Sequence, residues 1–181
     1  MKEELVEMFK KTGAFKTGDF VLASGRKSNV YVDCRLLTLD GEALSKISQY
    51  MLNCVQKNTI ELPTYFGGVT SGADPIVAGV ITTAWDYGIV TKGFFVRKEA
   101  KGHGLKKQIE GHCPPGERVV IFDDVATTGG SSQIAVDAVQ EIGCTVDGIY
   151  VIVDREEGAR ERFAEQNIPF YSLITLKDLQ S

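Results

Sequence analysis

The chain has 181 residues, of which 43% are hydrophobic, and this predicts one globular domain spanning residues 1–181. It carries 20 basic and 24 acidic residues, and the net charge of −4 argues against a nucleic-acid partner. The longest nearly apolar run, residues 75–85, is too short to cross a bilayer, and the charged residues 1–4 begin no secretion signal. We therefore expect no membrane partner.

The cysteines and histidines give little support to a metal site. The four cysteines are Cys34, Cys54, Cys113 and Cys144. Their wide, irregular spacing without a Cys-x-x-Cys motif indicates reduced thiols and a cytoplasmic location. The two histidines, His103 and His112, are too few for a His-rich metal site. We predict no metal-ligating residues in the chain.

Hydrophobic periodicity predicts alternating helices and strands along the chain. Helical spacing of apolar residues marks residues 2–12, 41–57, 75–87, 132–142 and 156–166. Apolar, β-branched runs predict strands at residues 31–35, 65–69, 89–96, 118–122, 146–153 and 169–173. Residues 13–25 are rich in turn formers, and residues 97–111 are charged and lack apolar periodicity. Gly143 is placed to end the helix that precedes it.

This alternation predicts an α/β fold, a parallel sheet with helices on both faces. Ligands of such sheets bind at the carboxyl ends of the strands. Four polar loops follow predicted strands, at residues 68–75, 97–111, 123–132 and 154–158. Because these loops share one edge of the sheet, we expect a single site there.

The loop at residues 123–132 carries the most specific signal. Two adjacent carboxylates, Asp123 and Asp124, follow an apolar run and precede a loop of hydroxyl and glycine residues. Backbone amides at 127–131 and the N-terminus of a helix are suited to a phosphate, with Gly129 and Gly130 allowing a close approach. The carboxylates can accept hydrogen bonds from sugar hydroxyls, so the loop predicts a phosphorylated ribose. The alternative is an ordinary strand–helix connection in which Ser132 caps the helix.

The other loops add charge around that site. Residues 97–107 hold Arg97, four lysines (Lys98, Lys101, Lys106 and Lys107) and one acidic residue, Glu99. His103 lies between two glycines, so this segment predicts a flexible cationic flap that closes over a polyanion. A solvated charged loop is the alternative.

Two further loops contribute more weakly. Residues 68–75 are suited to a second anion, although Asp74 before Pro75 is equally consistent with a helix cap. Arg155 follows a buried strand and can pair with a carboxylate, either of a ligand or of the neighbouring Glu156 or Glu157.

The motif Asp-Asp-Val-Ala-Thr-Thr-Gly-Gly-Ser at residues 123–131 resembles the phosphoribosyl pyrophosphate motif of the type I phosphoribosyltransferases. Further blocks resemble the orotate phosphoribosyltransferases in particular, and they occur in the order found in that family. These blocks are residues 20–28, 31–33, 67–75, 97–104 and 154–159. Together they span roughly residues 15–160.

The resemblance implies a fold, a reaction and an assembly. The fold is the type I phosphoribosyltransferase sheet with a small N-terminal hood (residues 1–35) and a flexible flap (residues 97–111). The reaction transfers ribose 5-phosphate from phosphoribosyl pyrophosphate to orotate, giving orotidine 5′-monophosphate and pyrophosphate, in de novo pyrimidine (UMP) biosynthesis. Mg²⁺ is the implied cofactor. The implied assembly is a homodimer whose flaps reach the active site of the other subunit.

The resemblance also assigns residues to roles. The implied catalytic residues are Lys101, His103, Asp123 and Asp124. The residues implied to bind phosphoribosyl pyrophosphate are Arg97, Lys98, Lys101, His103, Asp123, Asp124, Val125, Ala126, Thr127, Thr128, Gly129, Gly130 and Ser131. Orotate is assigned to Thr127, Arg155 and Tyr31.

One departure and two alternatives bear on specificity. Ala23 stands where many family members carry a lysine that reaches the base and the ribose pyrophosphate; Arg26 and Lys27 are the nearby cations. A phosphoribosyltransferase for another nucleobase is therefore the first alternative. The second is a regulator that senses phosphoribosyl pyrophosphate and binds RNA or DNA, which the negative net charge disfavours.

Overall fold

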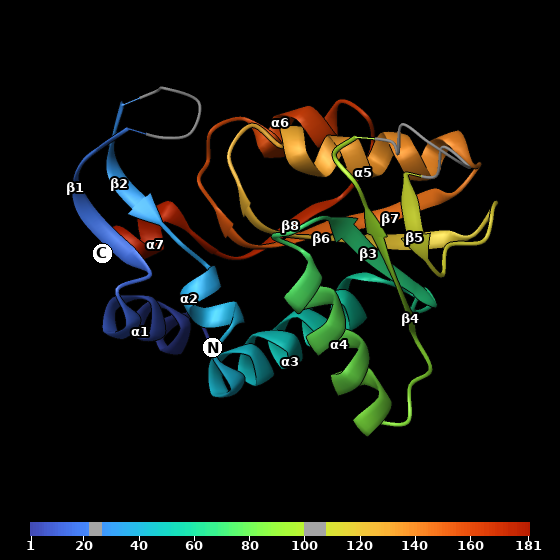
Figure 1. Ribbon diagram of the computed structural model, residues 1–181, viewed down its shortest axis with the longest axis horizontal. Coiled ribbons are helices and arrows are strands. Elements are labelled where there is room, and N and C mark those ends of the chain that lie inside the picture. Colours follow the sequence, from blue (N-terminus) through green and yellow to red (C-terminus); the bar gives the residue numbers. More distant parts are fainter. Residues whose placement is uncertain (22–26, 100–107) are drawn as a thin grey trace.

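A six-stranded sheet forms the centre of the computed structural model, which describes residues 1–21, 27–99 and 108–181 (Figure 1). In spatial order its strands are β5 (Ile109–Gly111), β4 (Lys92–Val96), β3 (Tyr65–Val69), β6 (Arg118–Ala126), β7 (Thr145–Asp154) and β8 (Phe170–Thr175). The strands β4, β3, β6, β7 and β8 run parallel to one another. The edge strand β5 pairs antiparallel with β4.

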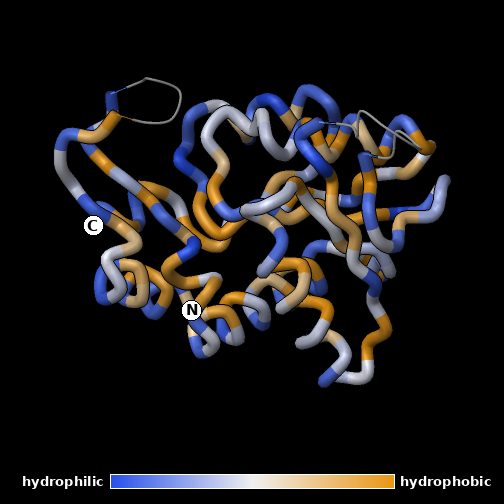
Figure 2. The backbone as a smooth tube through the Cα atoms, viewed as in Figure 1, coloured by the Kyte–Doolittle hydropathy of each residue, from blue (hydrophilic) through white to orange (hydrophobic). Residues whose placement is uncertain are grey.

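Helices cover both faces of this sheet, as the sequence predicts (Figure 1). Helices α3 (Gly41–Asn58) and α4 (Asp74–Asp86) lie on one face, and α5 (Gly130–Glu141) and α6 (Ala159–Ala164) lie on the other. Each face has its own cluster of buried apolar side chains. In Figure 2 the hydrophobic colour follows the central strands. Because helices cover both faces of the sheet, β7 is buried along nearly its whole length.

The N-terminal segment forms a separate layer beside the sheet. It comprises α1 (Lys2–Thr12), an antiparallel hairpin of β1 (Phe15–Val21) and β2 (Lys27–Val32), and the short helix α2 (Arg35–Thr38). The C-terminal helix α7 (Leu176–Gln180) contacts α1, and a 2.9 Å ion pair joins Lys2 to Asp178. The two ends of the chain are thus fastened to one another.

Several sequence-based boundaries were wrong. The turn predicted over residues 13–25 contains β1, and the strand predicted over 31–35 is β2, which ends earlier, at Val32. β1 is largely exposed and lacks alternating burial, so its sequence carries little strand signal. The strand β5 lies in the segment expected to be irregular, and α6 begins at Ala159 rather than 156, after Gly158 at φ +106°.

The strand β6 extends four residues beyond the predicted end at residue 122. Its last residues pair with β7, Val125 with Val153 and Ala126 with Asp154. The neighbouring β3 packs tightly against it, because a Cβ on Gly68 would lie 2.2 Å from the carbonyl oxygen of Phe122. None of the described helices is both long and apolar enough to cross a membrane.

Candidate active site

A cavity of about 280 Å³ opens where β3 and β6 end. The segment after β2, the loop after β3, the residue Lys98 after β4 and the acidic end of β6 all contribute to it. Its lining residues are Val32, Asp33, Cys34, Arg35, Val69, Thr70, Ser71, Gly72, Lys98, Asp123, Asp124, Val125 and Ser131. The predicted convergence of loops on one sheet edge is therefore confirmed for three of the four loops.

The adjacent carboxylates lie inside β6, not after it as the sequence suggested. Asp123 is only 4% exposed and accepts hydrogen bonds from the Ser132 hydroxyl (2.8 Å) and from the backbone amide of Asp124 (3.0 Å). Burial first, and then the neighbouring Asp124, raises the pKa of Asp123 to about 7. The pair thus holds negative charge at an energetic cost that a ligand with hydroxyl donors would offset.

The loop after β6 has the form expected of a phosphate cradle. Helix α5 begins at Gly130, so its first backbone amides have no partner one turn earlier in the helix. Gly129 adopts φ +76°, and a Cβ there would lie 2.6 Å from the Phe163 ring. Gly130 has no positive φ, and a Cβ there would meet nothing closer than Thr128 Oγ1 at 3.8 Å. Gly129 is also the cap of α5, so the alternative in which Ser132 caps the helix is wrong; the Ser132 hydroxyl donates to Asp123 instead.

The loop after β3 lies against the carboxylates. Thr70, Ser71 and Gly72 line the cavity, and the Thr70–Ser71 peptide is cis. A Cβ added to Gly72 would approach Asp124 Oδ1 to 2.7 Å. Asp74 is the first residue of α4 and makes no capping hydrogen bond, so the helix-cap alternative is wrong. The hydroxyl-rich part of this loop therefore shares one cavity with Asp123 and Asp124.

Arg97 and Lys98, the two basic residues of the flap that the structure describes, lie in different surroundings. Lys98 lines the cavity, whereas Arg97 donates through Nε to Glu110 of β5 at 3.2 Å. The predicted site residues Lys101 and His103 lie outside the described residues, as do Lys106 and Lys107 and the family departure Ala23 with its neighbour Arg26.

Arg155 is buried between the sheet and the N-terminal hairpin. Its Nε lies 3.0 Å from Glu157 Oε1, and its Nη2 donates to the Ser28 hydroxyl of β2 at 3.2 Å. Of the two neighbouring acids that the sequence offered, Glu157 is the partner, because Glu156 pairs with Lys177 at 2.8 Å. The ion pair with Glu157 and the hydrogen bond to Ser28 orient the guanidinium, although its buried Nε makes no hydrogen bond in the described part of the chain. A ligand oxygen can take the position of the Ser28 hydroxyl.

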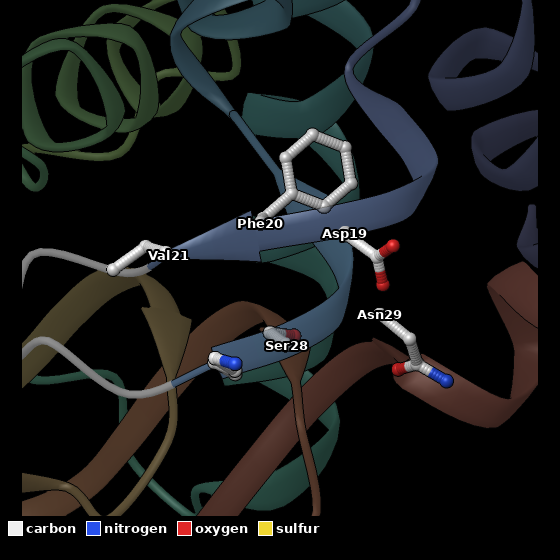
Figure 3. Close-up of a pocket in the computed structure, with 6 residues that line it drawn as sticks. Asp19, Phe20, Val21, Ser28 and Asn29 are labelled. Atoms are coloured by element: carbon white, nitrogen blue, oxygen red, sulfur yellow. The ribbon is translucent and has the colours of Figure 1, made fainter.

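A second cavity, of about 430 Å³, lies along the hairpin (Figure 3). Its lining residues are Asp19, Phe20, Val21, Lys27, Ser28 and Asn29. In Figure 3 the ring of Phe20 projects to the side opposite the polar groups of Asp19 and Asn29. The predicted base contact Tyr31 packs on Phe20, with ring centroids 5.5 Å apart. Because Ser28 also contacts Arg155, this cavity adjoins the arginine.

Sequence reasoning missed an ion pair at the first cavity. Arg35 donates from Nε to Asp33 Oδ1 and from Nη2 to Asp33 Oδ2, each at 2.8 Å. The hydrogen bonds from Arg35 lower the pKa of Asp33. The available signal was an Asp-x-Arg triplet directly after a strand, but nothing local shows that the chain returns to β6 there.

Comparison with known proteins extends over nearly the whole chain. It is 44% identical to an orotate phosphoribosyltransferase of Rhodopirellula baltica over 92% of this chain and 88% of the relative. It is 42% identical to that of Aquifex aeolicus over 98% of this chain and 97% of the relative. No protein-family model matches the chain.

Solved structures agree with these relatives. An orotate phosphoribosyltransferase of Mycobacterium tuberculosis, crystallised with 5-phospho-α-D-ribosyl 1-diphosphate, superposes with a TM-score of 0.81 at 32% identity over 99% of both chains. The Aeropyrum pernix enzyme gives 0.83 at 38% identity over 97% of this chain and 95% of its own.

Proposed function

The chain belongs to the orotate phosphoribosyltransferases, and from this premise we propose what each described residue does in the reaction. The reaction transfers ribose 5-phosphate from phosphoribosyl pyrophosphate to orotate and yields orotidine 5′-monophosphate and pyrophosphate, in pyrimidine biosynthesis. One observation carries the residue assignment: the buried Arg155 directly follows β7, the strand beside β6. The carboxylates and the phosphate loop of β6 are the donor half of the site.

The donor half holds phosphoribosyl pyrophosphate. The first amides of α5, with the loop residues 125–131, bind the 5′-phosphate, since the positive end of the helix favours an anion. Asp123 and Asp124 accept hydrogen bonds from the ribose hydroxyls. Lys98 and the loop Thr70–Gly72 face the pyrophosphate from the far side of the same cavity. Arg97, Lys101 and His103 complete the charge around the pyrophosphate as the flap closes.

The acceptor half holds orotate. Arg155 offers two N–H groups to the orotate carboxylate, with the Ser28 hydroxyl displaced from Nη2. The flat base then lies towards the hairpin, near Tyr31, with Thr127 at the carboxyl end of the adjacent strand β6. This arrangement brings the base nitrogen to the ribose carbon from the face opposite the pyrophosphate.

Catalysis arises from positioning and charge stabilisation. As the bond from the ribose carbon to pyrophosphate breaks, the sugar becomes cationic and the leaving group gains negative charge. The carboxylates of Asp123 and Asp124 stabilise the sugar, while Lys98, Lys101 and His103 stabilise the leaving group. Neither a covalent nucleophile nor a cysteine takes part.

Mg²⁺ fits this cavity as a companion of the substrate. Among the described residues, no group of three or more His, Cys, Asp or Glu side chains could hold a metal ion by itself. The acidic side chains Asp123 and Asp124 are nevertheless hard oxygen donors of the kind Mg²⁺ prefers through its water ligands. With the diphosphate, Mg²⁺ would supply neutralising positive charge.

The substrate assignment predicts a clear order of preference among bases. With phosphoribosyl pyrophosphate and Mg²⁺, the purified protein turns over orotate at least 100-fold more efficiently than uracil, because only orotate has a carboxylate for Arg155; this ratio is roughly the few kcal/mol of one charged pair. Adenine and hypoxanthine serve as controls for base class. A preference for any of these three bases over orotate contradicts the assignment.

We also propose a cytoplasmic homodimer with shared active sites. All four cysteines are free, as in proteins of a reducing compartment. Arg97 points to β5 of its own chain rather than into the cavity, which suits a flap that serves the neighbouring subunit.

Shared sites predict recovery of activity on mixing two inactive variants. We expect Lys101→Ala and Arg155→Ala each to be nearly inactive alone. After subunit exchange, one of the two active sites in each hybrid dimer is intact. A statistical mixture then regains about a quarter of the wild-type activity, since half of the dimers are hybrids. No recovery after exchange proven by mass spectrometry means that each chain is self-contained.

A further inference from the structure

Two thiols lie close together at the end of the sheet opposite the active site. Cys113 follows β5 and Cys144 precedes β7, so both lie near the amino ends of β6 and β7 (Figure 1). Their Sγ atoms are 3.9 Å apart although 31 positions separate them in sequence. Neither residue lines the cavities of the reaction described above.

The backbone around the pair is held in place on both sides. The amide of Gly116 donates to the carbonyl of Ile142 (3.3 Å), and the amide of Thr145 donates to that of Glu117 (2.9 Å). The Cys144 thiol donates to the carbonyl of Pro114 at 3.3 Å. A disulfide has an S–S distance of about 2.05 Å. Forming the bond therefore requires the two sulfurs to approach by a further ~1.9 Å.

We propose that Cys113 and Cys144 form a reversible intramolecular disulfide by exchange with a small disulfide such as oxidised glutathione. Cys113 is partly exposed and Cys144 is 5% exposed, so Cys113 meets the oxidant first. Its thiolate attacks one glutathione sulfur and releases a glutathione thiolate. Cys144 then loses its proton, attacks the Cys113 sulfur and releases the second glutathione. Two protein thiols are oxidised, and one glutathione disulfide is reduced to two thiols.

The environment of the pair sets the conditions for this exchange. Burial, with a smaller contribution from Cys144, raises the pKa of Cys113 to about 12. Because the thiolate is the attacking species, the exchange is slow at neutral pH and accelerates as the pH rises. The bond closes a loop in the chain and so stabilises the folded protein.

The test is oxidation of the full chain with excess oxidised glutathione at pH 8.5, followed by denaturation, alkylation of the remaining thiols and peptide mass spectrometry. We expect two of the four thiols to be lost, a Cys113–Cys144 peptide to appear, and dithiothreitol to reverse both changes. The oxidised protein should melt roughly 5–10 °C higher, from the loop-closure entropy.

Matched variants separate this site from general oxidation. Cys113→Ser and Cys144→Ser each abolish the cross-link and the rise in melting temperature, whereas Cys54→Ser, at another partly buried cysteine, leaves both unchanged. Three results overturn the proposal: a stable glutathione adduct on Cys113 without the internal bond, a cross-link that involves Cys54, or four thiols still free after oxidation of the folded protein.

Discussion

Arg155→Ala raises the KM for orotate by roughly 30- to 1000-fold, the effect of removing one member of a buried charged pair. The KM for phosphoribosyl pyrophosphate changes by less than about threefold, because that substrate binds at the neighbouring strand. The preference for orotate over uracil falls to near unity, since only the orotate carboxylate needs the guanidinium. Steady-state kinetics with both bases measure all three quantities.

The structure supplies controls for this prediction. Arg160→Ala removes a second arginine near the same strand end, but Arg160 pairs with Asp154 and is half exposed, so the preference for orotate persists. Ser28→Ala keeps the charge of Arg155 and removes one hydrogen bond, so the KM for orotate changes by less than about tenfold. An unchanged ratio of orotate to uracil turnover in Arg155→Ala removes the arginine from base recognition.

The position of Arg155 also shows where sequence reasoning ends. Arg155 follows a buried strand and pairs with Glu157, two residues further along the chain. Both features are local, so the sequence could suggest them. The contact of Arg155 with Ser28 joins residues 127 positions apart, and no periodicity or motif reports such a contact. The same holds for Asp33 and Arg35, which reach the cavity because the segment after β2 meets the carboxyl end of β6.

Elements were predictable in proportion to their burial. The helix α3 and the strand β3 bury a regular set of apolar side chains, and their boundaries agree with the prediction to within one residue. The strand β1 is mostly exposed and β5 has three residues, so neither carries a periodic signal. The phosphate loop was predictable for another reason: its glycines and hydroxyls are required by what the backbone must bind, whatever packs around them.

Asp123→Asn is expected to stabilise the free protein while it impairs the enzyme. The folded pKa of Asp123 is about 7, above the usual value of 3.8, because burial and Asp124 disfavour the carboxylate. A raised carboxyl pKa means that the folded state binds the proton more tightly than the unfolded state. The contribution of Asp123 to the free energy of unfolding is therefore fully present below about pH 4 and is lost as the pH rises through about 7. The asparagine variant has no such loss.

Urea unfolding at pH 5 and pH 8 measures this difference. At pH 8 we expect the variant to have an unfolding free energy higher by about 2–4 kcal/mol, the equivalent of two to three pKa units; at pH 5 the gap narrows to less than half. Ser132 still donates to the amide oxygen, whereas the Asp124 backbone amide loses its acceptor, so we expect the lower end of this range. Asp137→Asn, on the exposed side of α5, is the matched control and should change neither value.

The same substitution lowers kcat/KM by roughly 10- to 100-fold, because a neutral amide accepts a hydrogen bond from a ribose hydroxyl less strongly than a carboxylate. Stability and activity thus move in opposite directions at one atom. This is the signature of a carboxylate retained for its ligand, since a structural carboxylate would lose both when neutralised. A variant less stable than the wild type at pH 8 would falsify the account of Asp123 as a buried, strained charge.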